Sequence, residues 1–134
     1  RLSVLVAAAV LARCIGDRAL ADDVALLVLT GAGLTVLTGA GNDTIVAGSG
    51  ANSIDAGAAN DLVQFLSANF TDADTVGGAA GSDTLEITDT ATVVDADFTH
   101  VTSVETLLLS DTGAQNVTLS TLSDAAGVRT VDAT

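Results

Sequence analysis

A pattern of small, acidic and branched residues recurs every nine positions in the first half of the chain. The segments 39–46, 48–55 and 57–64 each carry small residues at their first and third places and Asp or Asn at the fifth. A branched aliphatic residue follows two places later in every copy. A unit this short cannot bury a core alone, so its copies must stack, and the pattern predicts a solenoid of short parallel strands.

Glycine-rich turns and one inward aliphatic residue define the geometry expected for each repeat. Glycines let the backbone adopt positive φ and expose its carbonyls, and two repeats complete one coil. Residues 18 positions apart should therefore stack, which places Asp43 over Asp61 on one edge with a cation between them. Asn52 belongs to the opposite edge, where the same step reaches Leu34 and Phe70, so we expect that edge to be a poor cation site.

The inward aliphatic positions begin before the acidic turns. Stepping by nine residues gives an apolar column of Leu27, Val36, Ile45, Ile54 and Val63. Over the same steps the acidic place reads Ala25 and Leu34 before Asp43 is reached. We therefore expect the solenoid to begin with coils that hold no cation.

A fourth copy, at 77–85, supplies a further acidic residue, Asp83, and is displaced from the others by an insertion at 66–76. The insertion carries Asp72 and Asp74, which have two interpretations. They belong to a solvated loop, or they complete a second cation site together with Asp83.

A different repeat follows Asp83. The segment 83–90 aligns with 105–112 at a step of 22, and 104–107 aligns with 128–131 at a step of 24. These segments are rich in Thr, Val and Leu, as β-strands are. We expect them to form longer solenoid coils without a metal turn.

The composition and charge exclude several partners. The chain carries 17 acidic residues, four Arg and no Lys, for a net charge of −13. Nucleic acids and acidic membrane surfaces bind clustered cations, so neither is an expected partner. Fifteen of the acids are Asp, which is favoured where a short carboxylate bonds its own turn or holds a metal. With three Phe and no Trp, Tyr or Met, the core must be built from small aliphatic residues.

Residues 1–24 form an apolar N-terminal segment with several interpretations. The stretch 2–12 is almost wholly apolar and is too short to span a bilayer. It fits a capping helix, buried strands, or the hydrophobic part of a signal peptide. Cys14 is the one cysteine, so no internal disulfide is possible. We divide the chain into this segment, a β-roll with nonapeptide turns at 25–91, and Thr/Val-rich solenoid coils at 92–134.

Residues 38–64 and 78–86 resemble the hemolysin-type calcium-binding repeats of RTX proteins, whose pattern is G-G-x-G-x-D-x-U-x. Residues 92–134 resemble the strand repeats of bacterial surface-layer proteins and adhesins. The resemblance implies an all-β, right-handed parallel β-solenoid (a β-roll or β-helix) whose turns bind Ca²⁺. It also implies a bacterial protein that is exported, lacks disulfides and folds on meeting extracellular calcium.

By the same resemblance, calcium would be held by side chains and backbone carbonyls of the turns. The carboxylates of Asp43, Asp61 and Asp83 would be ligands, with Asn52 as a weaker side-chain ligand on the opposite edge. Backbone carbonyls would come from the glycines of the turns, which are Gly39, Gly41, Gly57, Gly78 and Gly81.

The inventory of reactive side chains does not favour an enzyme. The chain has one His, which is His100, one Cys, and no Lys or Tyr. It contains no nucleophile-elbow, zinc-protease or phosphate-loop motif. We therefore expect no catalytic residues.

Three functions fit the repeats. They are a structural subunit of a surface layer or filament, a calcium-folding module of a larger secreted toxin or hydrolase, and an ice-binding adhesin with Thr arrays. We favour the structural subunit, because strand-like or apolar segments at both ends of the sequence leave edges that recruit partners. The expected partnership is head-to-tail self-association into a homo-oligomer or filament, outside the cell and attached to its surface.

Overall fold

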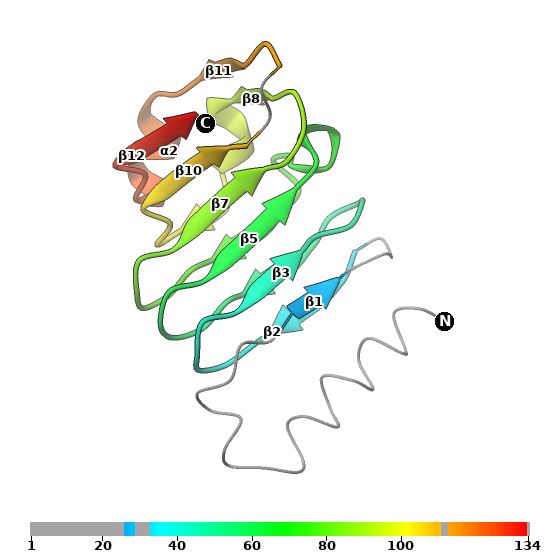
Figure 1. The fold of residues 1–134 in the computed structure, drawn as a ribbon, viewed down its shortest axis with the longest axis vertical. Coiled ribbons are helices and arrows are strands. Elements are labelled where there is room, and N and C mark those ends of the chain that lie inside the picture. Colours follow the sequence, from blue (N-terminus) through cyan, green and yellow to red (C-terminus); the bar gives the residue numbers. More distant parts are fainter. Residues whose placement is uncertain (1–25, 29–32, 111–112, 134) are drawn as a thin grey trace.

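The computed structural model describes residues 26–28, 33–110 and 113–133, and within them the chain winds into a solenoid of parallel strands (Figure 1). Two main sheets run along the sides of the coils. The predicted all-β parallel solenoid is therefore confirmed. The expectations for residues 1–24, including the signal peptide, the capping helix and Cys14, lie outside the described residues.

Sheet A contains six strands, one from each successive coil. In spatial order they are β1 (Leu26–Val28), β3 (Thr44–Val46), β5 (Leu62–Phe65), β7 (Thr84–Ile87), β10 (Thr106–Leu109) and β12 (Thr130–Ala133), and every neighbouring pair is parallel. Because each strand comes from the next coil, residues one coil apart lie side by side.

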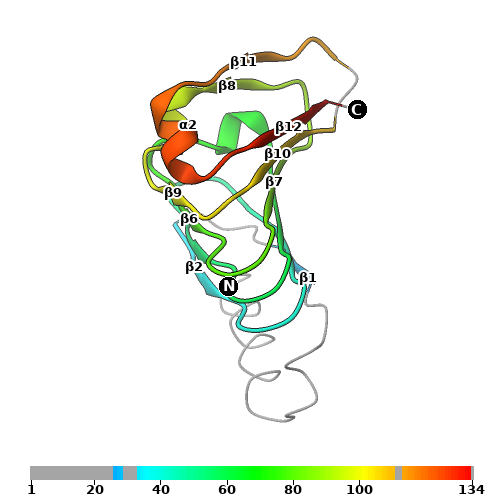
Figure 2. The same cartoon turned by 90° about the vertical axis from the view of Figure 1, so that its left-hand side faces the viewer.

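Sheet B, on the opposite side of the coils, contains four parallel strands. They are β2 (Thr35–Leu37), β4 (Ser53–Asp55), β6 (Thr75–Gly77) and β9 (Val101–Thr102). A third sheet is formed by β8 (Thr92–Val94) and β11 (Asn116–Thr118). The coils therefore widen from two strands to three, and Figure 2 shows the narrow coils of β1 and β2 opening into the wider ones of β8 and β11.

The residue step between stacked strands grows along the chain. Thr44 pairs with Leu62 at a step of 18, as the nine-residue repeat predicts. The next two steps, to Thr84 and then to Thr106, are 22 residues each. The last step, to Thr130, is 24 residues. The steps of 22 and 24 predicted for the later repeat are thus confirmed, and sheet A continues without a break across the change in coil shape.

The narrow coils are filled by the predicted aliphatic column. Val36, Ile45, Ile54 and Val63 are all buried, with at most 5% of each exposed. The backbone of Leu27, the first member of the column, is in register with Ile45. One branched residue per strand is enough here, because a coil of two short strands encloses little volume.

The wide coils are filled differently, and the expectation of a purely aliphatic core is wrong there. All three Phe of the chain are buried. The ring centroids of Phe65 and Phe70 lie 5.3 Å apart, and those of Phe70 and Phe98 also lie 5.3 Å apart in an edge-on arrangement. Phe70 follows the short helix η2 (Ser67–Asn69), and Phe98 ends η3 (Asp95–Phe98). The segments of the inserted helices thus supply two of the large rings that the wider section needs, and Phe65, at the end of β5, supplies the third.

The last described coil contains α2 (Thr121–Ala126). Backbone N–H groups at the start of this helix donate hydrogen bonds to the carboxylate of Asp95, from the coil before it. The N–H groups of Ser120 and Ser123 donate to Oδ1 of Asp95 at 2.8 and 2.9 Å, and the N–H of Leu122 donates to Oδ2 at 3.1 Å. The Ser123 hydroxyl also donates to Oδ1, at 2.9 Å. These hydrogen bonds, that of the Ser123 N–H most of all, lower the pKa of Asp95 to about 2.

Replacing Asp95 with Ala should destabilise the last coil near neutral pH and have little effect near pH 2. The folded-state pKa of about 2 lies below the ordinary value of 3.8. The ionised carboxylate therefore stabilises the fold above about pH 4, and this contribution is lost as the pH falls through the folded pKa. Chemical denaturation of both proteins at the two pH values measures the difference.

The control for this experiment is Asp124→Ala, which removes an exposed carboxylate that pairs with Arg129 at 2.6 Å. Exposed ion pairs contribute little, so its stability should stay close to that of the parent. An equal loss for Asp95→Ala at both pH values would contradict the role assigned to the carboxylate.

Candidate metal centre

Three buried aspartates form a row, the Asp ladder, along the edge of the solenoid that leads into sheet A. Asp43, Asp61 and Asp83 directly precede β3, β5 and β7, and each is at most 3% exposed. The N–H of Asp43 donates to Oδ1 of Asp61 at 2.8 Å, and the N–H of Asp61 donates to Oδ1 of Asp83 at 2.9 Å. Asp43 and Asp61 are therefore neighbours on one edge, as their spacing predicts, and Asp83 extends the row.

The corners that carry the ladder each contain two residues with positive φ, a conformation that glycine reaches without strain. The first position holds Gly39, Gly57 and Ala79, and the second holds Gly41, Ala59 and Gly81. The fourth copy of the turn is thus aligned on 79–83, because Gly77 is still the last residue of β6. Asp83 therefore occupies the acidic place of this copy, as predicted for residues 78–86, and Gly77 lies before the turn.

Successive corners approach so closely that they exclude a side chain. A Cβ on Gly57 would lie 1.8 Å from the carbonyl oxygen of Gly39, and a Cβ on Gly81 would lie 1.9 Å from that of Ala59. Carbonyl oxygens therefore project between the corners, and that of Gly39 accepts the N–H of Ala58 at 2.7 Å. Carboxylate and carbonyl oxygens are the ligands that calcium takes in proteins. The predicted carbonyl sources Gly39, Gly41, Gly57, Gly78 and Gly81 all belong to these corners, and their role as ligands stays a prediction.

Two oxygens of the ladder are buried without a hydrogen-bond donor. Oδ1 of Asp61 and Oδ1 of Asp83 each accept a backbone N–H, but Oδ2 of the same two residues has no hydrogen-bond partner. A buried polar oxygen without a partner costs free energy, and a charged one costs more. A bound calcium ion would supply the partner, so the donor set fits this ion.

The side chains supply only part of a calcium shell. Within the described ranges, no group of three or more His, Cys, Asp or Glu side chains surrounds one point. Each cation on the ladder would therefore draw on at most two carboxylates, with backbone carbonyls and water completing its coordination.

Two carboxylates of the ladder, those of Asp61 and Asp83, are costly to ionise. Burial raises the pKa of Asp61 to about 6; the N–H of Asp43 lowers it in part, and the charges of Asp83 and Asp43 raise it. Burial also raises the pKa of Asp83, against the effect of the Asp61 N–H, and the charge of Glu105 adds to the rise. At neutral pH the ladder is thus a row of like charges removed from water. A divalent cation would offset both the desolvation of the carboxylates and the repulsion between them.

On the opposite edge, Asn52 has a different neighbour from the one predicted. The N–H of Leu34 donates to Oδ1 of Asn52 at 3.3 Å, as the step of 18 predicts. On the other side of Asn52 the step is 22, and its neighbour is Asp74 instead of Phe70. The reason is η2, which lengthens this coil by the four extra residues and leaves Phe70 in the core.

Asp74 also settles the two interpretations of the insertion. It is fully buried and directly precedes β6 in sheet B, so it belongs neither to a solvated loop nor to a site with Asp83. Its Oδ2 accepts the N–H and the hydroxyl of Thr71 at 3.0 and 3.2 Å. Asp72 is exposed, as the loop interpretation predicts.

The amide group of Asn52 lies where the opposite edge would otherwise hold a cation. Its Nδ2 donates to the carbonyl oxygens of Gly48 and Gly50 at 3.2 and 2.9 Å and to Oδ1 of Asp74 at 3.1 Å. Two turn carbonyls and a buried carboxylate thus converge on an N–H donor. In this geometry the Nδ2 of Asn52 acts as a donor to these three groups, and the role of Asn52 as a calcium ligand stays a prediction.

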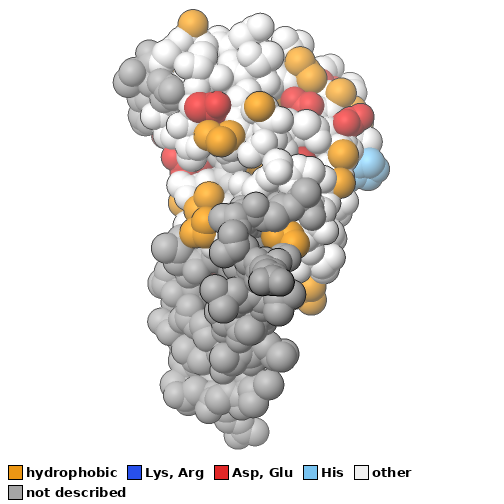
Figure 3. All heavy atoms as spheres, turned by 90° about the vertical axis from the view of Figure 1, so that its right-hand side faces the viewer, with side chains coloured by type: hydrophobic (Ala, Val, Ile, Leu, Met, Phe, Trp, Pro, Cys, Tyr) orange, Lys and Arg blue, Asp and Glu red, His pale blue; other side chains and the backbone are white. Residues whose placement is uncertain are grey.

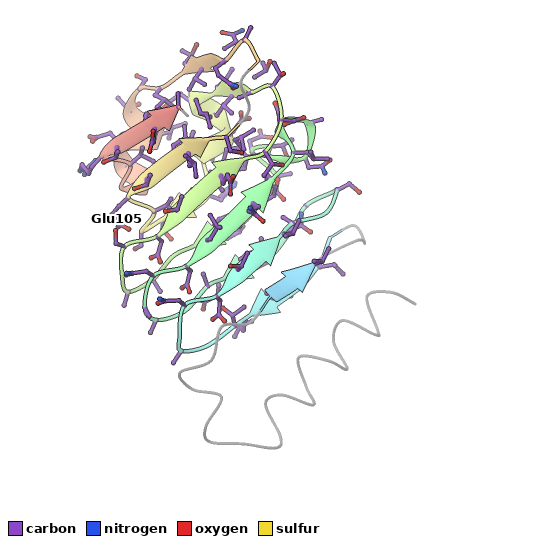
Figure 4. All side chains as sticks on the ribbon, viewed as in Figure 1. Glu105 is labelled. Atoms are coloured by element: carbon purple, nitrogen blue, oxygen red, sulfur yellow. The ribbon has the colours of Figure 1, made fainter. Side chains whose placement is uncertain are left out.

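The sequence interpretation misplaces one carboxylate, Asp74, and misses another, Glu105. A strict step of 18 passes over Asp74, because the sequence does not show whether the insertion stays in the coil. Glu105 falls in a coil expected to lack a metal turn, although the alignment of 83–90 with 105–112 already pairs it with Asp83. In the structure the N–H of Asp83 donates to Oε2 of Glu105 at 2.8 Å, and Figure 4 shows Glu105 on the edge formed by the corners.

The fold and the site define a β-roll with cation-binding turns, and comparison with known families identifies the turns. Residues 35–64 match the family model of the RTX calcium-binding nonapeptide repeat (4 copies). No curated protein and no solved structure matches the chain. Residues 35–64 are therefore RTX calcium-binding repeats of the hemolysin type, as predicted, and Ca²⁺ is the ion that such repeats bind. In the described part of the chain, no helix is long and apolar enough to span a membrane.

Calcium-free protein should become more stable as the pH falls from above 6 towards 4. The folded-state pKa of Asp61, about 6, lies above the ordinary value of 3.8, so the folded state binds more protons in this interval. With saturating calcium the contribution of Asp61 should reverse, so that stability falls as the pH falls, because protons compete with calcium for the carboxylate. Melting curves of decalcified and calcium-loaded protein across this range measure both trends. The calcium-free variant Asp61→Asn should lack this gain in stability at lower pH. A decalcified parent that loses stability as the pH falls from above 6 towards 4 would contradict the prediction.

Asn52→Asp should make the opposite edge depend on calcium. The change replaces the amide donor by a second carboxylate facing Asp74, and an uncompensated buried charge of this kind costs about 3 kcal/mol. We expect this loss in calcium-free protein, recovery when calcium is added, and one more bound calcium ion per chain. The control is Asn42→Asp at an exposed site, whose side-chain oxygen accepts the N–H of Asn60 and can still do so. Unchanged calcium-free stability of Asn52→Asp would contradict the role assigned to the amide.

Proposed function

We propose that this chain is an extracellular structural protein without enzymatic activity, a calcium-stabilised solenoid subunit that assembles head to tail into a surface layer or filament. The observation that carries the proposal is the unbroken parallel stacking of sheet A from β1 to β12, which one more coil of the same kind would continue. The four residues of β12 are exposed, and within the described part of the chain β12 pairs with β10. The other edge of β12 offers backbone groups to a further strand.

The side chains of β12 also favour the addition of a further coil of the same kind. Val131 is in register with Leu107, and Leu107 is fully buried while Val131 is 49% exposed. A further coil with a branched residue at this place would extend the column of the core. A second copy of the chain can supply that coil through a different surface from the one it presents, and such a heterologous contact, when it does not close on itself, builds filaments.

Calcium dependence supports a site of action outside the cell. The unpartnered carboxylate oxygens of Asp61 and Asp83 make the folded state costly until a cation binds. Extracellular calcium modules bind with dissociation constants of about 0.1–1 mM. A fold that needs calcium at such concentrations is stabilised where the ion is abundant, because ligand that binds only the folded state stabilises it by mass action.

The surface supports a structural role over the alternatives. His100 is exposed, and its Nδ1 lies 2.9 Å from the carbonyl oxygen of Asp72, a backbone contact of a loop. In Figure 3 acidic and single hydrophobic side chains are scattered over the described part of one face, with no Lys or Arg side chain visible among them. We also propose assembly over ice binding. The outward column of sheet A is Thr44, Leu62, Thr84, Thr106 and Thr130, with no second Thr column beside it.

Assembly is tested by sedimentation velocity and electron microscopy of the protein with and without calcium. We expect calcium-dependent oligomers or filaments, and we expect Val131→Asp to prevent them, because a charge then enters the column at the interface. The matched control is Leu37→Asp, which places the same charge at an aliphatic residue of sheet B that is 63% exposed. A parent protein that binds calcium and stays monomeric would contradict the proposal and favour a calcium-folding module of a longer secreted protein.

A further inference from the structure

The carboxylate row does not end at Asp83. The N–H of Asp83 donates to Oε2 of Glu105 at 2.8 Å, which repeats the contacts that join Asp43 to Asp61 and Asp61 to Asp83. Glu105 directly precedes β10, just as the three aspartates precede their strands of sheet A. It therefore occupies the next place of the ladder, outside the residues that match the calcium-binding repeat.

The choice of Glu at this place follows from the shape of its corner. Between β6 and β7 the corner spans residues 78–83, but between β9 and β10 it spans only 103–105. A shorter corner holds the backbone differently from the six-residue corners before it, and Ser103 turns it with a positive φ of 54°. The Glu side chain, one methylene longer than Asp, still reaches the N–H of Asp83.

Two oxygen atoms lie close together beside this step of the ladder. Asp83 is 2% exposed, and its Oδ2 has no hydrogen-bond partner. A Cβ added to Gly78 would lie 2.5 Å from this oxygen and 1.9 Å from the carbonyl oxygen of Ser103. The unpartnered carboxylate oxygen and the carbonyl oxygen therefore lie close together and pack against Gly78, where a larger residue would not fit.

The charges at this step also lack a protein counter-ion. Asp83 and Glu105 each carry a carboxylate, and the backbone N–H of Asp83 donates to that of Glu105. The guanidinium of Arg129, the one basic side chain in the described part of the chain, instead bonds Asp124 at 2.6 Å. Its hydrogen bonds to carbonyl groups go to Asp124 and Val128.

We propose that Asp83, Glu105 and the carbonyl oxygen of Ser103 form a further calcium site, which joins the last two-stranded coil to the three-stranded coils. Oδ2 of Asp83 and the carboxylate of Glu105 supply the charge, and water completes the shell at the partly exposed Glu105. The inference rests on calcium binding by the matched repeats and is independent of the proposed assembly. It places a calcium ion in the coil that the sequence predicts to have no metal turn.

The test is the number of calcium ions bound per chain, counted by equilibrium dialysis for the whole protein and for Glu105→Gln. Glutamine keeps the length of the side chain and an oxygen to accept the N–H of Asp83, so the fold is retained while the charge is lost. We expect the variant to bind one calcium ion fewer than the parent. Its gain in melting temperature on adding calcium should also be smaller.

The matched control is Glu86→Gln, which removes the same charge from the outer face of sheet A. Glu86 accepts a hydrogen bond from Nε2 of Gln64 at 2.6 Å, and glutamine can still accept it. This control should bind as many calcium ions as the parent. A parental calcium count for Glu105→Gln would overturn the inference while leaving the matched repeats as calcium sites. A parent that binds no calcium would overturn both, and a calcium-loaded parent that stays monomeric would overturn only the proposed assembly.

Discussion

A backbone N–H that donates to a buried carboxylate of the next coil is the contact on which this solenoid depends. On the Asp ladder it joins Asp43 to Asp61 and Asp61 to Asp83, and it sets which residues of successive coils lie side by side. The same contact leaves the second oxygen of Asp61 and of Asp83 buried without a donor. The geometry that orders the coils therefore also creates the need for a cation, because desolvated carboxylates must be neutralised or coordinated.

The two edges of the solenoid meet this need with different chemistry. On the edge of sheet B, the Nδ2 of Asn52 donates to two turn carbonyls and to the buried carboxylate of Asp74. On the edge of sheet A, the equivalent residues are aspartates, which offer no donor. Calcium held by the ladder would therefore stabilise one edge of the solenoid, while hydrogen bonds within the protein close the opposite edge.

The sequence predicted the features that arise within one or two repeats. The nine-residue period gave the strands, the buried column of Val36, Ile45 and Ile54, and the contact of Asp43 with Asp61. These depend on local backbone geometry, since each turn is specified by its own glycines and each strand by its own branched residue. The aromatic cluster of Phe65, Phe70 and Phe98 was not predicted, because nothing in the period shows that the coils become wide enough to enclose rings.

By itself, then, the sequence determined the class of fold, the acidic turns and the ion that suits them. The tertiary structure decided which residues meet across coils once the coils change length. Four extra residues around η2 bring Asp74 to Asn52, and a short corner before β10 brings Glu105 to Asp83. Neighbours in a solenoid are set by the length of each coil. That length depends on whether inserted residues fold into a helix, add a strand or tighten a corner, which only packing against the neighbouring coils decides.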